Sequence, residues 1–567
     1  MIPQAVIGYK DFYGAPAPED VFIFLRKYPT DLIILELSKI NALIFQESDD
    51  KLTLHKKIIA ASFSLLNEDK KQLLGNILSR GKNLEAMPFL FSSQSISKLI
   101  SLTFDNYYYV DTDVQVNKVE FQNDLWDNIL IANEIYYAQM TESDDINTYR
   151  GLWKLGMMQQ SYIRGFNELT LTGNIKVLLF YKFLKTKFES GEQLIDEFIK
   201  LMKLTGFFDY GLMTMEIVSK TVSSYSKDGQ AKWVMNFTES QLRMTEHFSY
   251  RPTDFQKGKS MSNVHRHIMT HPFYFLLNKH PIVIDFNFLS YMAEISLTFN
   301  FYSFTSLNGS SKYPKIKDFK RMLGKSYYEE FIMDQLVKSI FNKRGFKVFD
   351  DKTKNFADFT VVHEKDIYFF EIKSADLSLN TLEDNNDEEF EEFIKEQYAT
   401  KSDKYGRRKG IYQLLKHIED FAITDKLDSL LNGSSKNNWN IYPIIVYTEN
   451  ALDIPGVNGY LNDIFQAEAK AYQSHFKKIY PVAVINLTTF IEKYSLLKEN
   501  PLLLKTWIKS YWDRCNSSRR SFEKNRNPTQ FLRAGNPFRY YLNDTLQKQD
   551  PMVNFKTIAE NLGLNQN

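Results

Sequence analysis

The sequence predicts an α/β domain, a mixed sheet flanked by helices, preceded by a large, mainly α-helical N-terminal domain. Three observations lead to this prediction. With 567 residues, the chain is too long for a single hydrophobic core. Its first half spaces apolar residues at helical intervals. After about residue 310, short apolar runs of strand length alternate with helices.

The helical intervals are clearest in three segments, residues 94–100, 126–131 and 192–204. Gly206 follows the third segment and is expected to cap its C-terminus. The sequence has no fixed-period repeat, which argues against a solenoid. Residues 1–310 are therefore expected to form a mainly helical domain suited to recognition, sensing or oligomerisation.

The composition is that of an ordinary globular protein, with 43% apolar and 25% charged residues and a formal net charge of +1. Any basic surface for nucleic acid must therefore be local. Cys515 is the single cysteine, which excludes a disulfide scaffold. The N-terminus lacks a signal-peptide pattern, and no apolar run approaches the roughly 18 residues of a membrane span. A cytoplasmic protein without a membrane partner is expected.

The predicted α/β domain covers residues 311–500 and begins with a helix from Tyr327 to Phe341. A second helix is expected at 410–421. An acidic segment, 382–392, is expected to be a flexible solvated loop, or alternatively an acidic plug in the functional cleft. Five strand-like runs complete the domain, at residues 346–349, 358–362, 367–372, 441–447 and 482–485.

Residues 501–567 form a basic tail with eleven Lys/Arg and five Asp/Glu, a net charge of +6 (11 − 5). We expect this tail to be helical and to pack against the α/β domain. Two groups of cations are candidate contacts for nucleic acid, and a solvated surface is the alternative for both. They are Arg519, Arg520, Lys524 and Arg526 in the tail, and Arg407, Arg408 and Lys409 before the helix at 410–421.

A β-hairpin is expected where the second and third strand-like runs flank a polar turn. Asp358 stands at the start of its first strand, and Glu371 and Lys373 stand at the end of its second. Residues two apart on a strand share a face, so Glu371 and Lys373 project together, whereas Phe370 and Ile372 point to the opposite, core side. Asp358 is expected beside Glu371 and Lys373 across the hairpin.

Two carboxylates and a lysine are the groups that phosphodiester hydrolysis requires. Carboxylates hold hard divalent cations, which neutralise the phosphate and help to produce hydroxide. A neighbouring lysine can orient the attacking water or stabilise the developing charge. Asp358, Glu371 and the backbone carbonyl of Ile372 are therefore candidate ligands for Mg²⁺, with Mn²⁺ able to substitute, and Lys373 is the candidate group that serves the water.

The Glu-x-Lys triplet alone is a weak pattern. Two other triplets begin at Glu68 and Glu468, and both lie in polar or helix-patterned surroundings. Only the triplet at Glu371 ends a strongly apolar strand that is preceded by a strand bearing an aspartate. This context makes the pattern specific.

Residues 324–332, Gly-Lys-Ser-Tyr-Tyr-Glu-Glu-Phe-Ile, and the turn at Gly345 resemble the opening of PD-(D/E)xK nuclease domains, the restriction-endonuclease-like fold. In that superfamily a glycine precedes a helix bearing a glutamate, and a glycine turn leads into the first strand. The resemblance covers about residues 320–490. Ala357 stands where the pattern has a proline before the first aspartate.

The resemblance implies catalytic roles for two further side chains. The helix glutamate of the superfamily helps to organise the metal site, and Glu329 matches it better than Glu330 because Glu329 is in helical register with the apolar side. Several members carry a glutamine on the helix after the catalytic strand, which Gln413 matches. The RecB-like version has a tyrosine four residues later, where this chain has His417.

The function that the resemblance implies is that of a magnesium-dependent endonuclease, with DNA favoured over RNA. Bacterial restriction and antiviral defence effectors join such a nuclease to a large helical part. By this analogy we expect a restriction or anti-phage role, with a second copy of the chain or a defence-system protein as partner.

Two alternatives stay open. Arg266 and His271 fit the Arg-(Asn/His/Asp)-x3-His pattern of HEPN ribonucleases, in which an arginine and a histidine cleave RNA without a metal. In the second alternative, the α/β domain binds nucleic acid without catalysis. The complete set of two carboxylates and a lysine argues against this second alternative.

Overall fold

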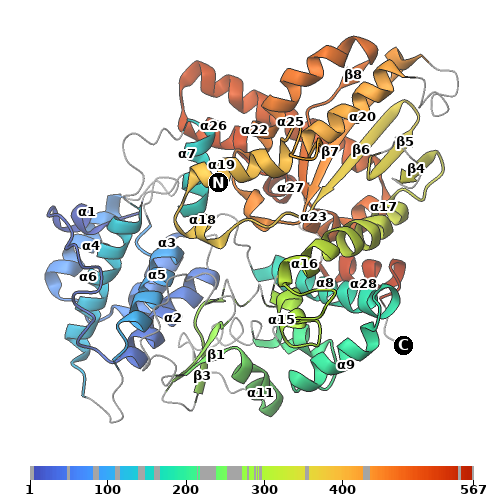
Figure 1. Ribbon diagram of the computed structural model, residues 1–567. Helices are drawn as coiled ribbons and strands as arrows, with labels where there is room; N and C mark the ends of the chain where they lie inside the picture. The colour runs from blue at the N-terminus through green and yellow to red at the C-terminus, as the bar shows by residue number, and fades with distance from the viewer. Residues whose placement is uncertain are drawn as a thin grey trace.

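Figure 1 shows the computed structural model, in which the chain is mostly helical with two mixed β-sheets. No helix in the described part of the chain is long and apolar enough to cross a membrane. The described residues are 6–46, 51–80, 89–108, 115–137, 147–158, 166–213, 215–217, 238–251, 268, 271–276, 280–286, 289, 292, 296–350, 357–424, 435–546 and 551–564.

The N-terminal helices pack around one hydrophobic core, to which Leu37, Leu99 and Trp126 contribute fully buried side chains. Two of the helices cover segments predicted from apolar spacing, 94–100 and 126–131, so those predictions are confirmed. The helices are α1 (Tyr9–Tyr13), α2 (Thr30–Gln46), α3 (Lys51–Ser62), α4 (Glu68–Arg80), α5 (Ser93–Asp105) and α6 (Lys118–Tyr137).

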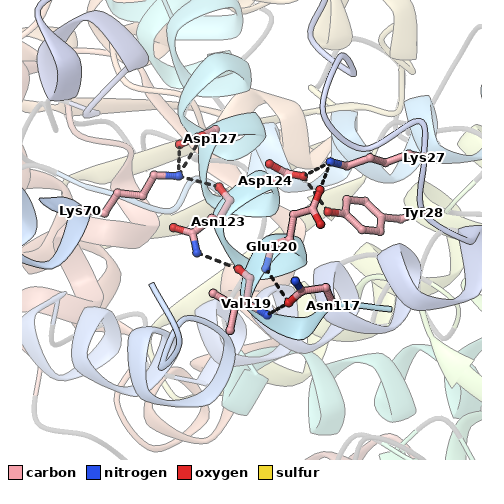
Figure 2. Close-up of polar contacts among 9 residues, drawn as sticks. All are labelled: Lys27, Tyr28, Lys70, Asn117, Val119, Glu120, Asn123, Asp124 and Asp127. Atoms are coloured by element: carbon pink, nitrogen blue, oxygen red, sulfur yellow. Dashed lines mark hydrogen bonds and ion pairs between the residues drawn. The ribbon is translucent and has the colours of Figure 1, made fainter. Parts of the chain in front are cut away.

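Carboxylates on one side of α6 fasten this bundle together, as Figure 2 shows. Asp127 Oδ1 lies 2.8 Å from Lys70 Nζ on α4. Asp124 Oδ2 lies 2.9 Å from Lys27 Nζ and accepts a hydrogen bond of 2.7 Å from the Tyr28 hydroxyl. The spacing of three residues brings both carboxylates to one side of the helix. Helix α6 thereby holds both α4 and the segment that precedes α2.

A three-stranded sheet interrupts the N-terminal region, which the mainly helical prediction did not include. Strand β1 (Ser249–Tyr250) runs parallel to β2 (Phe273–Leu276), and β2 runs antiparallel to β3 (His280–Val283). The run Phe-Tyr-Phe-Leu in β2 is completely buried and rich in aromatic residues, which favour strands. The run is too short to show an alternating pattern in the sequence.

Two helices before residue 310 pack against the C-terminal half. Helix α7 (Tyr149–Met158) buries Trp153 and Met157 in the core of the α/β part, and α8 (Phe166–Lys187) contacts the helices around residues 323–333 and 551–561. Helix α9 (Gly191–Leu201) is capped by Met202, so Gly206 is not the C-cap that we expected. Helices α11 (Glu239–His247) and α15 (Leu297–Ser303) also lie in the described part of this region.

The larger sheet contains the strands predicted from the sequence. Its order is β4-β5-β6-β7-β8, and β9 also pairs with β7. Strands β4 to β6 form an antiparallel meander, whereas β6, β7, β8 and β9 are parallel, and the short β8 was not predicted. The bounds are β4 (Phe346–Asp350), β5 (Phe359–His363), β6 (Asp366–Lys373), β7 (Asn440–Tyr447), β8 (Lys478–Ile479) and β9 (Ala483–Asn486).

Helices cover both faces of this sheet (Figure 1). A continuous helical stretch, α16 (Ile316–Met322), the π-helix η3 (Leu323–Met333) and α17 (Asp334–Ile340), covers one face and starts earlier than the predicted residue 327. Helices α20 (Ile411–Ile423) and α22 (Val457–Ala469) cover the other. Short 3-10 turns occur at η6 (Lys436–Asn438), η7 (Asn450–Asp453) and η8 (Lys470–His475).

The acidic segment 382–392 is not a loop, which corrects the prediction. It forms the end of α18 (Leu379–Glu383) and most of the first two turns of α19 (Asp387–Tyr398). Asn386 caps α19, and the carboxylates that follow occupy the first turn, where the helix dipole favours them. Phe390 and Tyr398 are fully buried, and Glu391 pairs with Arg150 on α7. The segment is therefore docked on α7 and is not a plug.

The basic tail is helical and packs on the α/β part, as predicted. The fully buried Arg539 guanidinium pairs with Glu492 at 2.5 Å. Helix α27 contacts β9, and α28 contacts α8 and α24. The final helices are α23 (Leu487–Glu492), α24 (Tyr494–Glu499), α25 (Leu502–Asn525), α26 (Pro528–Gly535), α27 (Phe538–Thr545) and α28 (Pro551–Asn561).

Candidate active site

The β5–β6 hairpin brings Asp358 to the end of β6. Phe359 on β5 is paired with Phe370 on β6, so Asp358, the residue before β5, lies beside the last residues of β6. The Ile372 N–H donates a hydrogen bond of 2.7 Å to Asp358 Oδ2. The first carboxylate of the predicted site is therefore fixed to the strand that carries the other two candidate residues.

Successive side chains along β6 point to opposite faces of the sheet, so the candidate site residues and the core residues lie on different faces. Phe370 and Ile372 belong to the core under η3 and α17. Glu371 and Lys373 point to the opposite face, where α20 lies. The Lys373 Nζ atom is 3.3 Å from Glu371 Oε2. The side chain of Glu371 is only 2% exposed and that of Lys373 is 17% exposed, so this ion pair is well shielded from solvent.

The π-helix η3 places Glu329 near the hairpin. The side chain of Glu329 is half-buried and its negative charge acts on Asp358, whereas Glu330 is exposed. A Cβ on Gly324 would lie 2.4 Å from Ser374 Oγ, so the glycine allows η3 to approach the residue after Lys373. Of the two adjacent glutamates, Glu329 therefore stays the candidate helix carboxylate of the site.

The electrostatics of Asp358 follow from this crowding. Burial raises the pKa of its carboxyl well above the ordinary value, and the charges of Glu371 and Glu329 raise the pKa further. The Lys373 ammonium and the Ile372 N–H act in the opposite direction. The charges of two carboxylates thus act on Asp358 against that of a single lysine.

A divalent cation fits the donor chemistry of this region. Carboxylate and carbonyl oxygens are the ligands that Mg²⁺ prefers, and a cation would offset the repulsion at Asp358. The candidate donors remain Asp358, Glu371 and the backbone carbonyl of Ile372. Over the described ranges, no three His, Cys, Asp or Glu side chains lie close enough together to hold a metal ion. The fit therefore rests on two carboxylates and one main-chain oxygen.

Helix α20 contributes a residue that the sequence analysis named only as a departure from the RecB-like pattern. His417 Nε2 lies 3.3 Å from Glu371 Oε1, and the imidazole is stacked near Phe369 with ring centroids 6.1 Å apart. Glu371 is thus held between Lys373 and His417. In the sequence, His417 could be placed on the same face of the helix as Gln413, because the two are four residues apart. That spacing does not reveal which of the two side chains reaches Glu371 on β6.

Gln413 caps its own helix. Its Oε1 accepts a hydrogen bond of 3.0 Å from the Gly410 N–H at the start of α20. The described contact of Gln413 is therefore with the main chain, and His417, one turn further along, contacts the carboxylate. The resemblance led us to a catalytic role for Gln413, and this geometry supports a structural one.

The candidate nucleic-acid contacts fall into two places. Arg407, Arg408 and Lys409 precede α20, where Arg407 pairs with Asp403 at 2.9 Å and Arg408 pairs with Glu419 at 3.3 Å. The tail residues lie on the last two turns of α25 or just beyond. There Arg519 makes two hydrogen bonds with Asp463, of 2.8 and 2.9 Å. All four candidate tail cations, Arg519, Arg520, Lys524 and Arg526, are exposed.

The metal-independent alternative is only partly described. Arg266 lies outside the described residues. His271 leads into β2, and its ring is stacked on Tyr250 with centroids 4.6 Å apart. The described residues thus place His271 beside a strand and provide no geometry for a pair with Arg266.

Comparisons of the chain with protein-family models, with curated sequences and with solved structures each return no significant match. The resemblance to PD-(D/E)xK nucleases therefore stays a prediction that rests on the motif residues and on the geometry of the hairpin.

Proposed function

We propose that this protein is a metal-dependent nuclease that hydrolyses phosphodiester bonds, with DNA as the favoured substrate. The observation that supports the proposal is the convergence of Asp358, Glu371 and Lys373 at one end of the hairpin. Asp358 Oδ2 is held by the Ile372 N–H, and Lys373 Nζ lies 3.3 Å from Glu371. Two carboxylates beside one lysine form a set suited to phosphodiester hydrolysis.

Each residue has a role that follows from its position. Asp358, Glu371 and the Ile372 carbonyl would hold the cation, which when bound supplies charge neutralisation and a lower pKa for water. Lys373 orients the attacking water and donates to the oxygens on which charge develops. Glu329 adds negative charge that strengthens cation binding, and His417 keeps Glu371 in one orientation.

The wider role that we propose is restriction or anti-phage defence in the cytoplasm. This part of the proposal comes from the analogy with effectors that combine a nuclease with a large helical part. A second copy of the chain, or another defence protein, would then act as the partner of the helical part.

The test is cleavage by the full chain of four substrates: supercoiled plasmid, linear duplex, single-stranded DNA and structured RNA. Each substrate is incubated with Mg²⁺, Mn²⁺ or EDTA, with wild type, Asp358→Ala, Lys373→Ala and the control Lys365→Ala. Lys365 is an exposed lysine in the turn of the same hairpin. We expect cutting that requires a metal, survives Lys365→Ala and is lost in the other two variants.

Cutting that persists in EDTA and in both site variants would contradict the proposal and favour metal-independent cleavage at Arg266 and His271. Binding of nucleic acid without cutting under any condition would favour the non-catalytic module. The ranking of the four substrates decides between DNA and RNA.

A further inference from the structure

The loop between α19 and α20, residues 399–410, carries an unusual combination of side chains. We call it the basic loop. It contains five cations, Lys401, Lys404, Arg407, Arg408 and Lys409, and one acid, Asp403, a net charge of +4 (5 − 1). Tyr405 stands among them and is 67% exposed. An aromatic ring with this exposure lies outside the core, where a ligand can reach it.

The basic loop stands at the same end of the sheet as Glu371 and Lys373. Phe369 contacts Phe421 and His417 on α20, and the next outward residue on this face, Glu371, contacts His417. Helix α20 therefore runs antiparallel to β6, and its first residue lies toward Lys373. The base of the loop therefore lies on the Lys373 side of α20, while Arg408 pairs with Glu419 on α20 and Lys401 pairs with Glu468 on α22.

The base of the loop is built to a fixed shape. The Lys409 N–H donates a hydrogen bond of 2.9 Å to the carbonyl of Thr400, which closes the loop. Gly410 has a φ of +56°, and a Cβ there would lie 2.1 Å from the carbonyl oxygen of the buried Tyr398. A glycine is therefore required at this point, and it lets the loop turn sharply outward from the end of α19.

Two cations flank the exposed ring. Lys404 Nζ and the Arg407 guanidinium lie 5.0 and 4.9 Å from the ring centroid of Tyr405. Arg407 also pairs with Asp403, but its side chain is 67% exposed, and such surface pairs are weak enough to be exchanged for a phosphate. The loop tip therefore combines an exposed aromatic ring with two cations that lie over it.

This combination matches single-stranded nucleic acid, in which the face of a base and the adjacent phosphates are accessible together. In a duplex the base faces are covered by their neighbours, so an exposed tyrosine would have nothing to stack on. We propose that the basic loop holds an unpaired stretch of the substrate, with Tyr405 stacked on a base and Lys404 and Arg407 on the flanking phosphates. This inference rests on the proposed nuclease function and assigns it a substrate form.

The test measures the binding of the full chain in EDTA, where a metal-dependent nuclease does not turn over. The probes are a fluorescent oligothymidylate of about 20 nucleotides and a blunt duplex of the same length, long enough to pass several aromatic contacts. The variants are Tyr405→Ala, Tyr405→Phe and the control Tyr108→Ala, a tyrosine that is 45% exposed in the helical half.

We expect Tyr405→Ala to weaken single-strand binding about tenfold, because one base–aromatic stack is lost. Tyr405→Phe keeps the ring and should bind like wild type, as should Tyr108→Ala, and duplex binding should not change. Wild-type affinity in Tyr405→Ala would overturn the inference. An equal loss for both probes would also overturn it, as would a wild-type chain that binds neither probe.

Failure of the inference is distinguishable from failure of the proposed function. Metal-dependent plasmid cutting by a chain in which Tyr405→Ala changes no affinity would overturn only the inference. Single-strand binding through Tyr405 by a chain that cuts nothing would support the inference while contradicting the nuclease.

Discussion

At the scale of single residues, Asp358 is the side chain on which the account depends most. Burial and two neighbouring carboxylates oppose its ionisation, and a cation would reverse that balance. Asp358, Glu371 and Lys373 could be chosen from the sequence because strand alternation determines which face each residue takes. His417 could not be chosen in the same way, because its contact with Glu371 joins elements that are 46 residues apart (417 − 371).

The first prediction concerns the helix carboxylate. Replacing Glu329 by Gln removes one negative charge near Asp358 and should lower the affinity of the site for Mg²⁺ by about tenfold. Cleavage by Glu329→Gln should therefore be slow at low Mg²⁺ and recover at high Mg²⁺. Titration of the cleavage rate with Mg²⁺ measures this shift. The exposed neighbour provides the control, and an equal shift in Glu330→Gln would contradict the assignment of Glu329.

The second prediction concerns pH. Burial, together with the charge of Asp376, raises the pKa of Glu449 from its ordinary value of 4.5 to about 7, against the opposing N–H groups of Ala451 and Leu377. Because the folded-state pKa is raised, this carboxyl contributes stability that is fully present below about pH 4.5. That contribution is lost as the pH rises through about 7.

The Glu449→Gln variant has no ionisable group at this position, so its stability does not depend on this titration. The free energy of unfolding of wild type, relative to the variant, should fall by about 3 kcal/mol between pH 4.5 and pH 8. Urea denaturation of both proteins across this range measures the difference. A constant difference between the two proteins would show that Glu449 does not titrate in this window.

At the scale of elements, the sequence predicted the strands and helices whose apolar residues form a local pattern. The strands of the meander were found because each is a short apolar run of strand length, and helix α20 because its apolar residues recur at intervals of three and four. The segment 382–392 was wrongly predicted to be a loop because it is strongly acidic. Phe390, Ile394 and Tyr398, which are all fully buried, recur at the four-residue spacing of a helix. Asn386 caps α19 and defines its start.

The third prediction concerns the fastening of α6 to α4. Lys70 and Asp127 have side chains that are only 10% and 16% exposed, and Asp127 also accepts a hydrogen bond from Tyr13. Asp127→Ala leaves the Lys70 ammonium buried without its carboxylate and should lower the free energy of unfolding by about 3 kcal/mol. Glu68 on α4 is the control because its side chain is 89% exposed in a pair with Lys71.

Urea unfolding, followed by circular dichroism, measures both variants. Glu68→Ala should change the stability by less than about 0.5 kcal/mol, as is usual for exposed pairs. Similar stabilities for Asp127→Ala and Glu68→Ala would mean that the α6 carboxylates do not fasten the bundle.

At the scale of the whole molecule, the boundary between the helical half and the α/β part does not fall cleanly at residue 310, because helices from before that residue pack against the α/β part. Trp153 and Met157 on α7 lie in the core of the α/β part, and α8 packs against η3 and α28 (Figure 1). The sequence could not predict this arrangement, since apolar spacing shows that a helix has a buried face but not what covers that face. The order of the larger sheet likewise depends on long-range pairing, which no local pattern specifies.

The fourth prediction follows from this packing. A fragment of residues 311–567 exposes the surfaces that α7 and α8 cover, whereas residues 147–567 retain both helices. The shorter fragment should aggregate or lose cooperative unfolding, because large apolar patches promote association. Size-exclusion chromatography and thermal unfolding of the two fragments measure this. A monomeric shorter fragment that unfolds as cooperatively as the longer one would contradict a structural role for α7 and α8.

The most direct test of the central claim is the binding of Mn²⁺, followed by electron paramagnetic resonance, together with Mn²⁺-dependent plasmid cleavage by the same samples. Glu371→Gln removes a proposed ligand, and Glu364→Gln changes an exposed glutamate in the turn of the same hairpin. We expect Glu371→Gln to lose Mn²⁺ affinity at least tenfold and to lose cleavage with it, while Glu364→Gln keeps both. Unchanged Mn²⁺ binding and cleavage in Glu371→Gln would show that Glu371 does not hold the metal.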